Sequence, residues 1–181
     1  MIFRLGTLAL VGSLLSAADA VTLLALDGQK QMVPITGKVT AVVFLSAVCP
    51  ISNEYVDRMI QLWRDYSPQG VQFLFVNSNA NEPAGEVRDH AAAAGFPFPV
   101  YRDIHHGLAN RLQASITPEA FLLDQGGKLR YQGAFDDARN PARVKVQFLK
   151  DAIAAVLAGK PVARPSAKAT GCTIKRERKV S

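Results

Sequence analysis

The sequence predicts an α/β fold in which helices flank a central mixed β-sheet and extra strands extend the sheet at the N-terminus. Residues 39–46 and 71–77 are continuous apolar runs rich in β-branched and aromatic side chains, which is typical of strands buried on both faces. Residues 51–66 between them carry apolar side chains at helical spacing, so the three segments form a parallel β-α-β unit. The turn 125–128 joins two later strands into a hairpin, which makes the sheet mixed.

The remaining elements follow from the same periodicities and from the turn residues that separate them. Short apolar stretches between Gly and Pro predict strands, and longer stretches with three- and four-residue apolar spacing predict helices. The predicted strands are 21–26, 31–34, 39–46, 71–77, 98–103, 120–124 and 129–133, and the predicted helices are 51–66, 84–94, 105–113 and 141–158. The order is β-β-β-α-β-α-β-α-β-β-α, in one domain that covers residues 21–160 without an internal repeat.

Residues 1–20 have the pattern of a secretory signal peptide. Arg4 precedes the apolar run 5–15, which is too short to cross a bilayer as a stable helix, and residues 18–20 form a small-x-small cleavage pattern. We expect cleavage after Ala20 and a mature protein that is periplasmic or secreted, with no membrane span. The alternative is an N-terminal anchor that is not cleaved.

The formal net charge of +6 lies at the C-terminal end of the chain. Lys160 and the tail 161–181 together carry seven Lys or Arg side chains and one Glu, so residues 1–159 are neutral in sum. Nucleic-acid-binding domains present a basic face with interleaved aromatic side chains, and this tail has no aromatic residue. We therefore expect no nucleic-acid partner. The tail shows no periodicity, and we expect it to be irregular.

Cys49 lies where the predicted strand 39–46 passes into a helix, and Pro50 follows it directly. The first turn of a helix has unpaired N–H groups and a dipole that favour an anion, here the nucleophilic thiolate form of cysteine. Ser46, Ser52 and the backbone N–H groups of this turn are candidate stabilisers of that thiolate. We therefore interpret Cys49 as the nucleophile of a catalytic site.

Thr117 and Pro118 directly precede the predicted strand 120–124. Within a sheet, proline is confined to edges, bulges and strand starts, so Pro118 marks the start of this strand. A cis peptide bond before Pro118 would present backbone beside the helix that begins at Cys49. With Pro50 and Glu119, these residues are the candidates for a substrate groove.

The ordered set of these pieces resembles the thioredoxin-fold superfamily, and within it the secreted redoxin or alkyl hydroperoxide reductase–thiol-specific antioxidant (peroxiredoxin-like) domain proteins. The resemblance covers about residues 22–158, and the pieces that carry it are 42–50, 71–77, 117–124 and 126–133. It implies a thioredoxin-like fold and thiol redox chemistry without a cofactor, with protein thiols or disulfides or a peroxide as partners. Members of this superfamily usually carry Cys-x-x-Cys at this junction. Ser52 replaces the second cysteine here, so Cys49 has no resolving thiol beside it.

A thiol peroxidase is the alternative enzyme. Peroxiredoxins carry Pro-x-x-x-Thr/Ser-x-x-Cys and an arginine that orients the peroxide. Ser46 matches the hydroxyl position, but Val42 stands at the proline position and Pro118 stands where the family has its arginine. Because that arginine stabilises the developing oxyanion, its absence favours thiol–disulfide exchange. Whether Arg102 or Arg130 substitutes for it is left open.

Cys172 is the second of two cysteines and lies in the tail next to Gly171. Its small neighbours predict a mobile and accessible thiol, and two cysteines in an oxidising compartment favour a disulfide or a redox pair. By analogy with the tail cysteines of some peroxiredoxins, Cys172 is a candidate resolving partner of Cys49, within the chain or in a second subunit of a homodimer. The sequence is also compatible with a permanent Cys49–Cys172 disulfide and with two unrelated free thiols.

The leading interpretation is an exported thioredoxin-like thiol–disulfide oxidoreductase. The alternatives are a thiol peroxidase and a redox-inactive thioredoxin-like binding module in which Cys49 is permanently bonded. A metal site is a further candidate, because copper-chaperone relatives of this fold use two nearby cysteines and a distant histidine, and the chain has His90, His105 and His106. Ser52 removes one such ligand, so we expect no metal.

Overall fold

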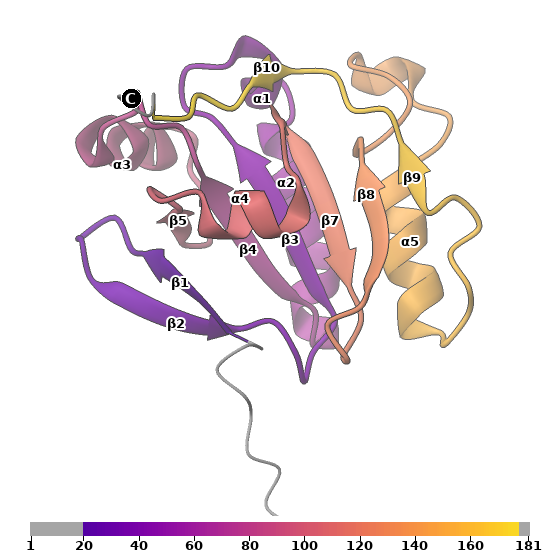
Figure 1. Cartoon of the computed structure of the whole chain (residues 1–181). Helices are drawn as coiled ribbons and strands as arrows, with labels where there is room; N and C mark the ends of the chain where they lie inside the picture. Colours follow the sequence, from indigo (N-terminus) through magenta and orange to yellow (C-terminus); the bar gives the residue numbers. More distant parts are fainter. Residues whose placement is uncertain (1–19, 178–181) are drawn as a thin grey trace, which may run out of the picture.

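The computed structural model describes residues 20–177 and shows an α/β fold with a mixed eight-stranded sheet and a separate two-stranded pair. The strands are β1 (Ala20–Leu24), β2 (Lys30–Pro34), β3 (Thr40–Leu45), β4 (Gln72–Asn77), β5 (Val100–Arg102), β6 (Ile116–Thr117), β7 (Glu119–Leu123), β8 (Leu129–Gly133), β9 (Ser166–Ala167) and β10 (Cys172–Thr173). The helices are α1 (Pro50–Asn53), α2 (Val56–Tyr66), α3 (Ala84–Ala93), α4 (Gly107–Leu112) and α5 (Phe148–Leu157), with 3-10 turns at Ser67–Gln69 and Pro141–Arg143. The sheet order is β2-β1-β5-β4-β3-β7-β8-β9 (Figure 1).

The centre of the sheet confirms the predicted β-α-β unit. β3 is parallel to β4, and β4 is parallel to β5, whereas β7 runs antiparallel to β3 and to β8. The carboxyl ends of β3, β4 and β5 therefore meet at one edge of the sheet, where the loop after β3 begins. The predicted signal peptide lies outside the described residues except for Ala20, which is the first residue of β1.

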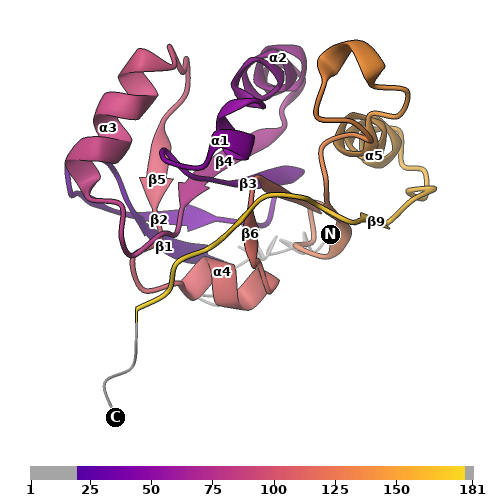
Figure 2. The same ribbon diagram turned by 90° about the horizontal axis from the view of Figure 1, so that it is seen from above.

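The two faces of the sheet carry separate apolar clusters. In Figure 2, α2, α3 and α5 lie on one face and α4 lies on the other. Every residue of β3 is buried, because its successive side chains point to opposite faces: Val43 packs in the cluster under α2 and Phe44 in the cluster under α4. Phe44 also meets Phe121 of β7 edge to face, with ring centroids 5.7 Å apart. This double-sided burial fixes the position of the loop that follows β3.

The predicted helix 51–66 is interrupted. The structure has α1 and α2 in its place, with Glu54 and Tyr55 between them. The backbone N–H of Tyr55 donates to the carbonyl group of Ser52, three residues back, instead of the fourth residue back that a continuous α-helix requires. The predicted single helix was therefore wrong at this point.

The predicted terminal helix 141–158 begins later than expected, at Phe148. One carboxylate oxygen of Asp137 accepts hydrogen bonds from the backbone N–H groups of Lys145 and Val146, at 2.9 and 3.1 Å. These bonds hold this stretch of backbone outside the helix. The sequence pattern did not reveal that Asp137 would bind the backbone N–H groups of residues eight and nine positions further along the chain.

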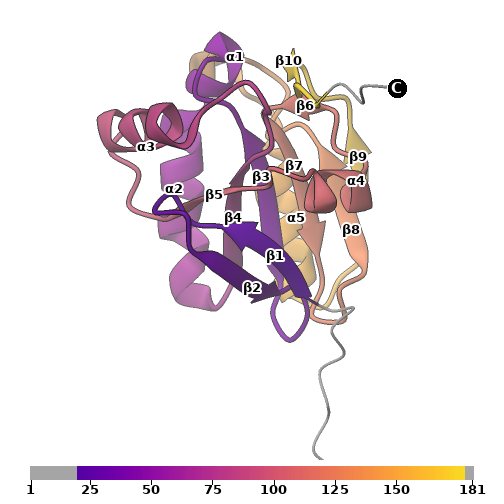
Figure 3. The same ribbon diagram turned by 60° about the vertical axis from the view of Figure 1, so that its left-hand side comes forward.

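The tail is not irregular throughout, and this prediction is corrected. β9 pairs in parallel with β8, and β10 pairs antiparallel with β6. Ile174, just after β10, is only 3% exposed and packs in the cluster under α4. Figure 3 shows β10 beside β6 at the end of the sheet that carries α1. The tail therefore lies against the domain.

None of the helices between residues 20 and 177 has the length and apolar character that a membrane span requires.

Replacing Gly133 with alanine tests the attachment of the tail to the sheet. Gly133 has a φ of +125°, and a Cβ at this position would overlap the carbonyl group of Ala167 in β9. We expect Gly133→Ala to lower the free energy of unfolding by about 1–3 kcal/mol, measured by denaturant titration. We also expect faster proteolytic cleavage in the tail, because β9 loses its place beside β8.

Gly85→Ala is the matched control for this variant. Gly85 lies in the first turn of α3, and the nearest atom to an added Cβ is a side-chain nitrogen of Arg88 at 3.7 Å. Alanine is favoured over glycine in a helix, so this variant should gain up to about 1 kcal/mol. Equal stability of Gly133→Ala and wild type would contradict the described pairing of β9.

Candidate active site

Cys49 caps the N-terminus of α1, after the short loop 46–48 that follows β3, and is 1% exposed. The backbone N–H of Ser52 donates a hydrogen bond to the Cys49 sulfur at 3.4 Å. Because α1 has a single turn, its helix dipole is small. The N–H groups at its start are therefore the main groups that would stabilise a Cys49 thiolate. Pro50 is exposed at the start of α1, where its missing N–H leaves no bond unmade.

The hydroxyl groups of Ser46 and Ser52 hold the backbone of this loop. Ser46 Oγ accepts a hydrogen bond from the N–H of Cys49 at 3.0 Å, and Ser52 Oγ accepts one from the N–H of Ser46 at 3.1 Å. Both serines are buried. The two hydroxyl groups thus position Cys49 through its backbone, while the Ser52 N–H makes the direct contact with the sulfur.

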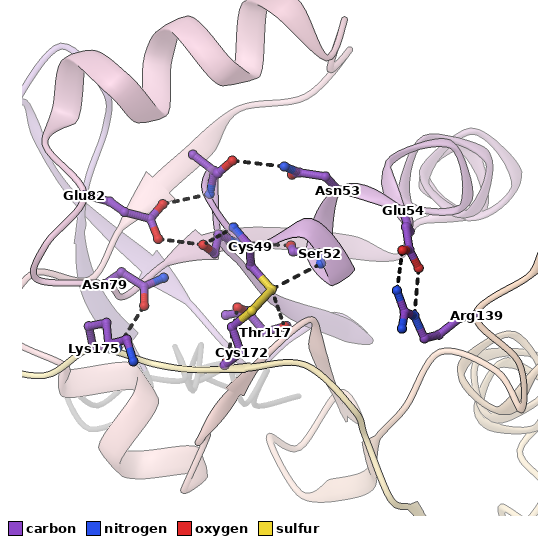
Figure 4. Close-up of a disulfide and its surroundings, with 12 residues drawn as sticks. Cys49, Ser52, Asn53, Glu54, Asn79, Glu82, Thr117, Arg139, Cys172 and Lys175 are labelled. Atoms are coloured by element: carbon purple, nitrogen blue, oxygen red, sulfur yellow. Dashed lines mark hydrogen bonds and ion pairs between the residues drawn. A yellow bond between two sulfur atoms is a disulfide. The ribbon is translucent and has the colours of Figure 1, made fainter.

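Glu82 is a buried carboxylate beneath this loop that the sequence pattern did not reveal. It is 1% exposed and accepts hydrogen bonds from Ser46 Oγ at 2.6 Å, from the Ala47 N–H at 2.7 Å and from the Asn77 side chain at 2.8 Å (Figure 4). A buried charge is tolerated when several donors satisfy it. Residues 78–83 have the composition of a polar loop, and no local signal separates a buried Glu there from a solvated one.

Thr117 and Pro118 lie across from Cys49, as the sequence predicted, and the peptide bond between them is cis. The carbonyl oxygen of Thr117 is 3.3 Å from the Cys49 sulfur. One carboxylate oxygen of Glu119 accepts a hydrogen bond from the N–H of Ser115 at 2.9 Å. Thr117 therefore contacts Cys49 through its backbone.

Cys172 forms a disulfide bond with Cys49 (Figure 4). The two residues are separated by 123 positions in the sequence, and their Cα atoms are 6.0 Å apart. Pairing of β10 with β6 sets Cys172 opposite Thr117, and Thr117 Oγ1 donates a hydrogen bond to the Cys172 carbonyl group at 3.4 Å. The hypothesis of two unrelated free thiols is therefore wrong, whereas a redox pair and a permanent bond both remain.

The two arginines that the sequence left open for a peroxide site have different partners. Arg102 donates a hydrogen bond to the backbone carbonyl of Glu82 at 2.8 Å. Arg130 forms an ion pair with Asp124 at 3.2 Å, at the β7–β8 turn and so at the far end of β7 from Pro118. Both guanidinium groups are engaged with these groups instead of the Cys49 sulfur.

The outer side of α1 is tied to its neighbours. Asn53 donates a hydrogen bond to the carbonyl group of Ala47 at 3.0 Å, and His90 of α3 binds the Asn53 side chain at 2.9 Å. Burial lowers the pKa of His90, which favours its neutral form at pH 7. Glu54 forms an ion pair with Arg139, and the hydrogen bond from this arginine lowers the pKa of Glu54. These contacts fix the helical turn that holds Cys49.

The part of the chain that the structure describes has no group of three or more His, Cys, Asp or Glu side chains that could hold a metal ion.

Comparison with solved structures places this fold among thioredoxin-like proteins. A hypothetical protein from Sinorhizobium meliloti 1021 is 29% identical, with a TM-score of 0.77 over 87% of this chain and 91% of its own. An uncharacterized conserved protein from Geobacillus kaustophilus is 28% identical, with a TM-score of 0.77 over 89% of this chain and 90% of its own. A secreted Mycobacterium tuberculosis disulfide oxidoreductase homologous to E. coli DsbE shares the fold at 16% identity, with a TM-score of 0.55 over 77% of this chain and 95% of its own.

Comparison with curated proteins finds no match. A family match comes instead from the sequence over residues 16–132, which include β3, Cys49, the buried Glu82 and the Thr117–Pro118 bond. This stretch is more than half of the chain, and it matches the AhpC/TSA family. The chain belongs to the AhpC/TSA family and has the thioredoxin-like fold.

Proposed function

We propose that this protein is an exported thiol–disulfide oxidoreductase in which Cys49 and Cys172 form the redox pair. The observation that carries the proposal is the disulfide between the only two cysteines of the chain, at the N-terminus of α1 and beside the cis Thr117–Pro118 bond. A dithiol that closes to a disulfide transfers two electrons, so the chemistry needs no cofactor.

In the reduced protein, Cys49 is the nucleophile. Its thiolate attacks one sulfur of a partner disulfide, which forms a mixed disulfide and releases one partner thiolate. The Cys172 thiolate then attacks the Cys49 sulfur, which closes the Cys49–Cys172 bond and releases the second partner thiolate. The partner gains two electrons and the protein loses two. Ser52 supports the first step, because its N–H stabilises negative charge on the Cys49 sulfur.

Relatives of the fold support this class of reaction and this location. One is named as a secreted disulfide oxidoreductase, and another, from Chlorobium tepidum TLS, as a thiol:disulfide interchange protein of the thioredoxin family. Their names agree with the signal-peptide pattern of residues 1–20, so we place the mature domain, residues 21–160 with its tail, in the periplasm or outside the cell. The partners are then protein thiols and disulfides.

Disulfide exchange is favoured over peroxidase activity by the groups around Cys49. A peroxidase needs a cation or several donors aimed at the developing oxyanion. Here the Ser46 hydroxyl donates to Glu82, and Arg102 and Arg130 bind elsewhere. With these groups engaged elsewhere, the surroundings of the Cys49 sulfur suit exchange with another sulfur better than reduction of a peroxide.

Single-cysteine variants test the redox pair. We expect Cys49→Ser to lose turnover with glutathione disulfide, because its remaining thiol, Cys172, stops at one mixed disulfide. Cys172→Ser should form one mixed disulfide per molecule. Its turnover should be lower than that of wild type by about 100-fold or more, because the intramolecular closing step is lost. Stopped-flow release of glutathione and mass spectrometry of the trapped protein measure both effects.

Two results from companion measurements, of peroxide consumption and of disulfide reduction, would contradict the proposal. Cys49-dependent consumption of hydrogen peroxide without disulfide reduction establishes the peroxidase. A Cys49–Cys172 bond that mild reductants leave closed establishes the redox-inactive binding module, in which the bond stabilises the fold by about 5 kcal/mol on the chain-entropy model.

Glu82→Gln tests the buried carboxylate as a positioning residue. The amide group of Gln replaces an oxygen that accepts hydrogen bonds from Ser46, Ala47 or Asn77, so donors face each other. We expect the free energy of unfolding to fall by about 1–3 kcal/mol. The rate constant for attack by Cys49 should fall as well, because the Ser46 hydroxyl no longer holds the Cys49 backbone N–H.

Glu86→Gln is the matched control, since Glu86 is exposed in α3 four residues further along the chain. Its stability should stay within about 0.5 kcal/mol of wild type, and its exchange rate should be unchanged. If Glu82→Gln behaves like Glu86→Gln in both measurements, Glu82 does not position the site.

A further inference from the structure

The two ends of the disulfide differ in exposure. Cys49 is 1% exposed, whereas Cys172 is half-buried and is followed by the exposed residue Thr173. In Figure 4 the C-terminal segment runs beside the Cys49 loop, and Cys172 projects from it toward Cys49. A molecule approaching from solvent therefore meets the Cys172 side of the bond first.

We call residues 164–176 the C-terminal strap. On the N-terminal side of Cys172, the strap is held by the sheet. The Pro165 carbonyl group accepts a hydrogen bond from the N–H of Gln132 at 3.0 Å, and the Ala167 carbonyl group accepts one from the N–H of Ala134 at 3.2 Å. These bonds belong to the pairing of β9 with β8 and do not involve the disulfide.

On the C-terminal side of Cys172, the strap is held by the core and by the loops around it. Ile174 is 3% exposed, and its N–H donates to the Ser115 carbonyl group at 2.9 Å. The N–H of Lys175 donates to the Asn79 side chain at 2.9 Å, and the Lys175 carbonyl group accepts from the N–H of Ala80 at 2.7 Å. These contacts too are independent of the sulfur atoms.

The strap also lies tightly on the backbone that borders Cys49. A Cβ on Gly171 would overlap the carbonyl group of Thr117, and that carbonyl oxygen is 3.3 Å from the Cys49 sulfur. The strap is thus anchored on both sides of Cys172 and packed beside Cys49 by contacts that do not involve the sulfur atoms.

We propose that partner thiols exchange with Cys172 and not with Cys49, because the strap keeps Cys49 covered in both redox states. This inference rests on the proposed function and assigns the sulfur through which electrons from a thiol donor reach the pair. The attack of reduced Cys49 on a partner disulfide then requires local opening of the strap.

The exchange proceeds in two balanced steps. A donor thiolate attacks the Cys172 sulfur, so a donor–Cys172 disulfide forms, the Cys49–Cys172 bond breaks, and the electron pair leaves on Cys49. The N–H of Ser52 stabilises this leaving thiolate. A second donor thiolate then attacks the donor sulfur of the mixed disulfide, and Cys172 leaves as a thiolate and takes a proton. The donor is oxidised to a disulfide and the protein is reduced by two electrons.

Trapping the mixed disulfide tests the assignment. Oxidised wild-type protein is mixed with glutathione, quenched with acid and N-ethylmaleimide at short times, and digested with trypsin. Cys49 lies in the peptide 39–58 and Cys172 in the peptide 169–175. We expect glutathione on 169–175 and N-ethylmaleimide on 39–58 in the same molecules.

The opposite distribution, with glutathione on 39–58, overturns the inference and leaves the proposed function standing. A disulfide that glutathione does not open at all overturns the proposed function itself. The two failures are therefore distinguishable in one experiment.

A second measurement tests whether the strap covers Cys49 without the disulfide. Reduced Cys49→Ser and Cys172→Ser, each with one thiol, are labelled with a maleimide that carries a polyethylene glycol chain. We expect Cys49 in Cys172→Ser to react at least about tenfold more slowly than Cys172 in Cys49→Ser, because labelling requires local opening of the strap. The contact with Ser52 favours the thiolate of Cys49, so slower labelling of Cys49 reports access and not intrinsic reactivity.

Adding Gly171→Ala to Cys172→Ser should raise the labelling rate of Cys49, since the added Cβ displaces the strap from Thr117. If the double variant does not fold, the comparison of Cys49→Ser with Cys172→Ser still tests the inference. Labelling of Cys49 as fast as that of Cys172 shows that the strap leaves on reduction and overturns the inference.

Discussion

The backbone of Thr117 is the constraint on which the candidate site depends. Its carbonyl oxygen lies 3.3 Å from the Cys49 sulfur. In the antiparallel pair of β6 with β10, Thr117 stands opposite Cys172. Gly171 passes so closely over the same carbonyl group that a side chain would not fit. Pro118 then leads into β7, which pairs with β3. Thr117 thus brings together the helical turn after β3, which carries one sulfur, and the tail, which carries the second.

The site places its two sulfurs on elements of different kinds. Cys49 follows a strand that is buried at every position, and a charged network centred on Glu82 fixes its loop. Because a buried carboxylate is costly unless its donors are in place, this network has one arrangement. Cys172 sits on a two-residue strand at the surface. With Ser52 in place of a neighbouring cysteine, the second sulfur comes from this strand, and its access to partners differs from that of Cys49.

The fold was largely predictable because its strongest signals are local. The runs 39–46 and 71–77 have the length and the β-branched and aromatic composition of buried strands, and Pro118 marks the start of a strand. Cys49 followed from its place between a strand and a helical turn. Helix boundaries were less predictable. The break before α2 depends on one backbone hydrogen bond, and the late start of α5 depends on two hydrogen bonds accepted by Asp137.

By itself, the sequence determined the order of the longer strands and helices, the identity of the buried strands and the replacement of a second cysteine by Ser52. The tertiary structure alone decided that Cys172 reaches Cys49 and that Glu82 is buried beneath the site. Strands of two residues have no periodicity to detect, and pairing of β10 with β6 joins segments more than 50 residues apart. A lone Glu in a polar loop looks the same whether it faces water or three donors. Both features therefore depend on long-range contacts that no local pattern encodes.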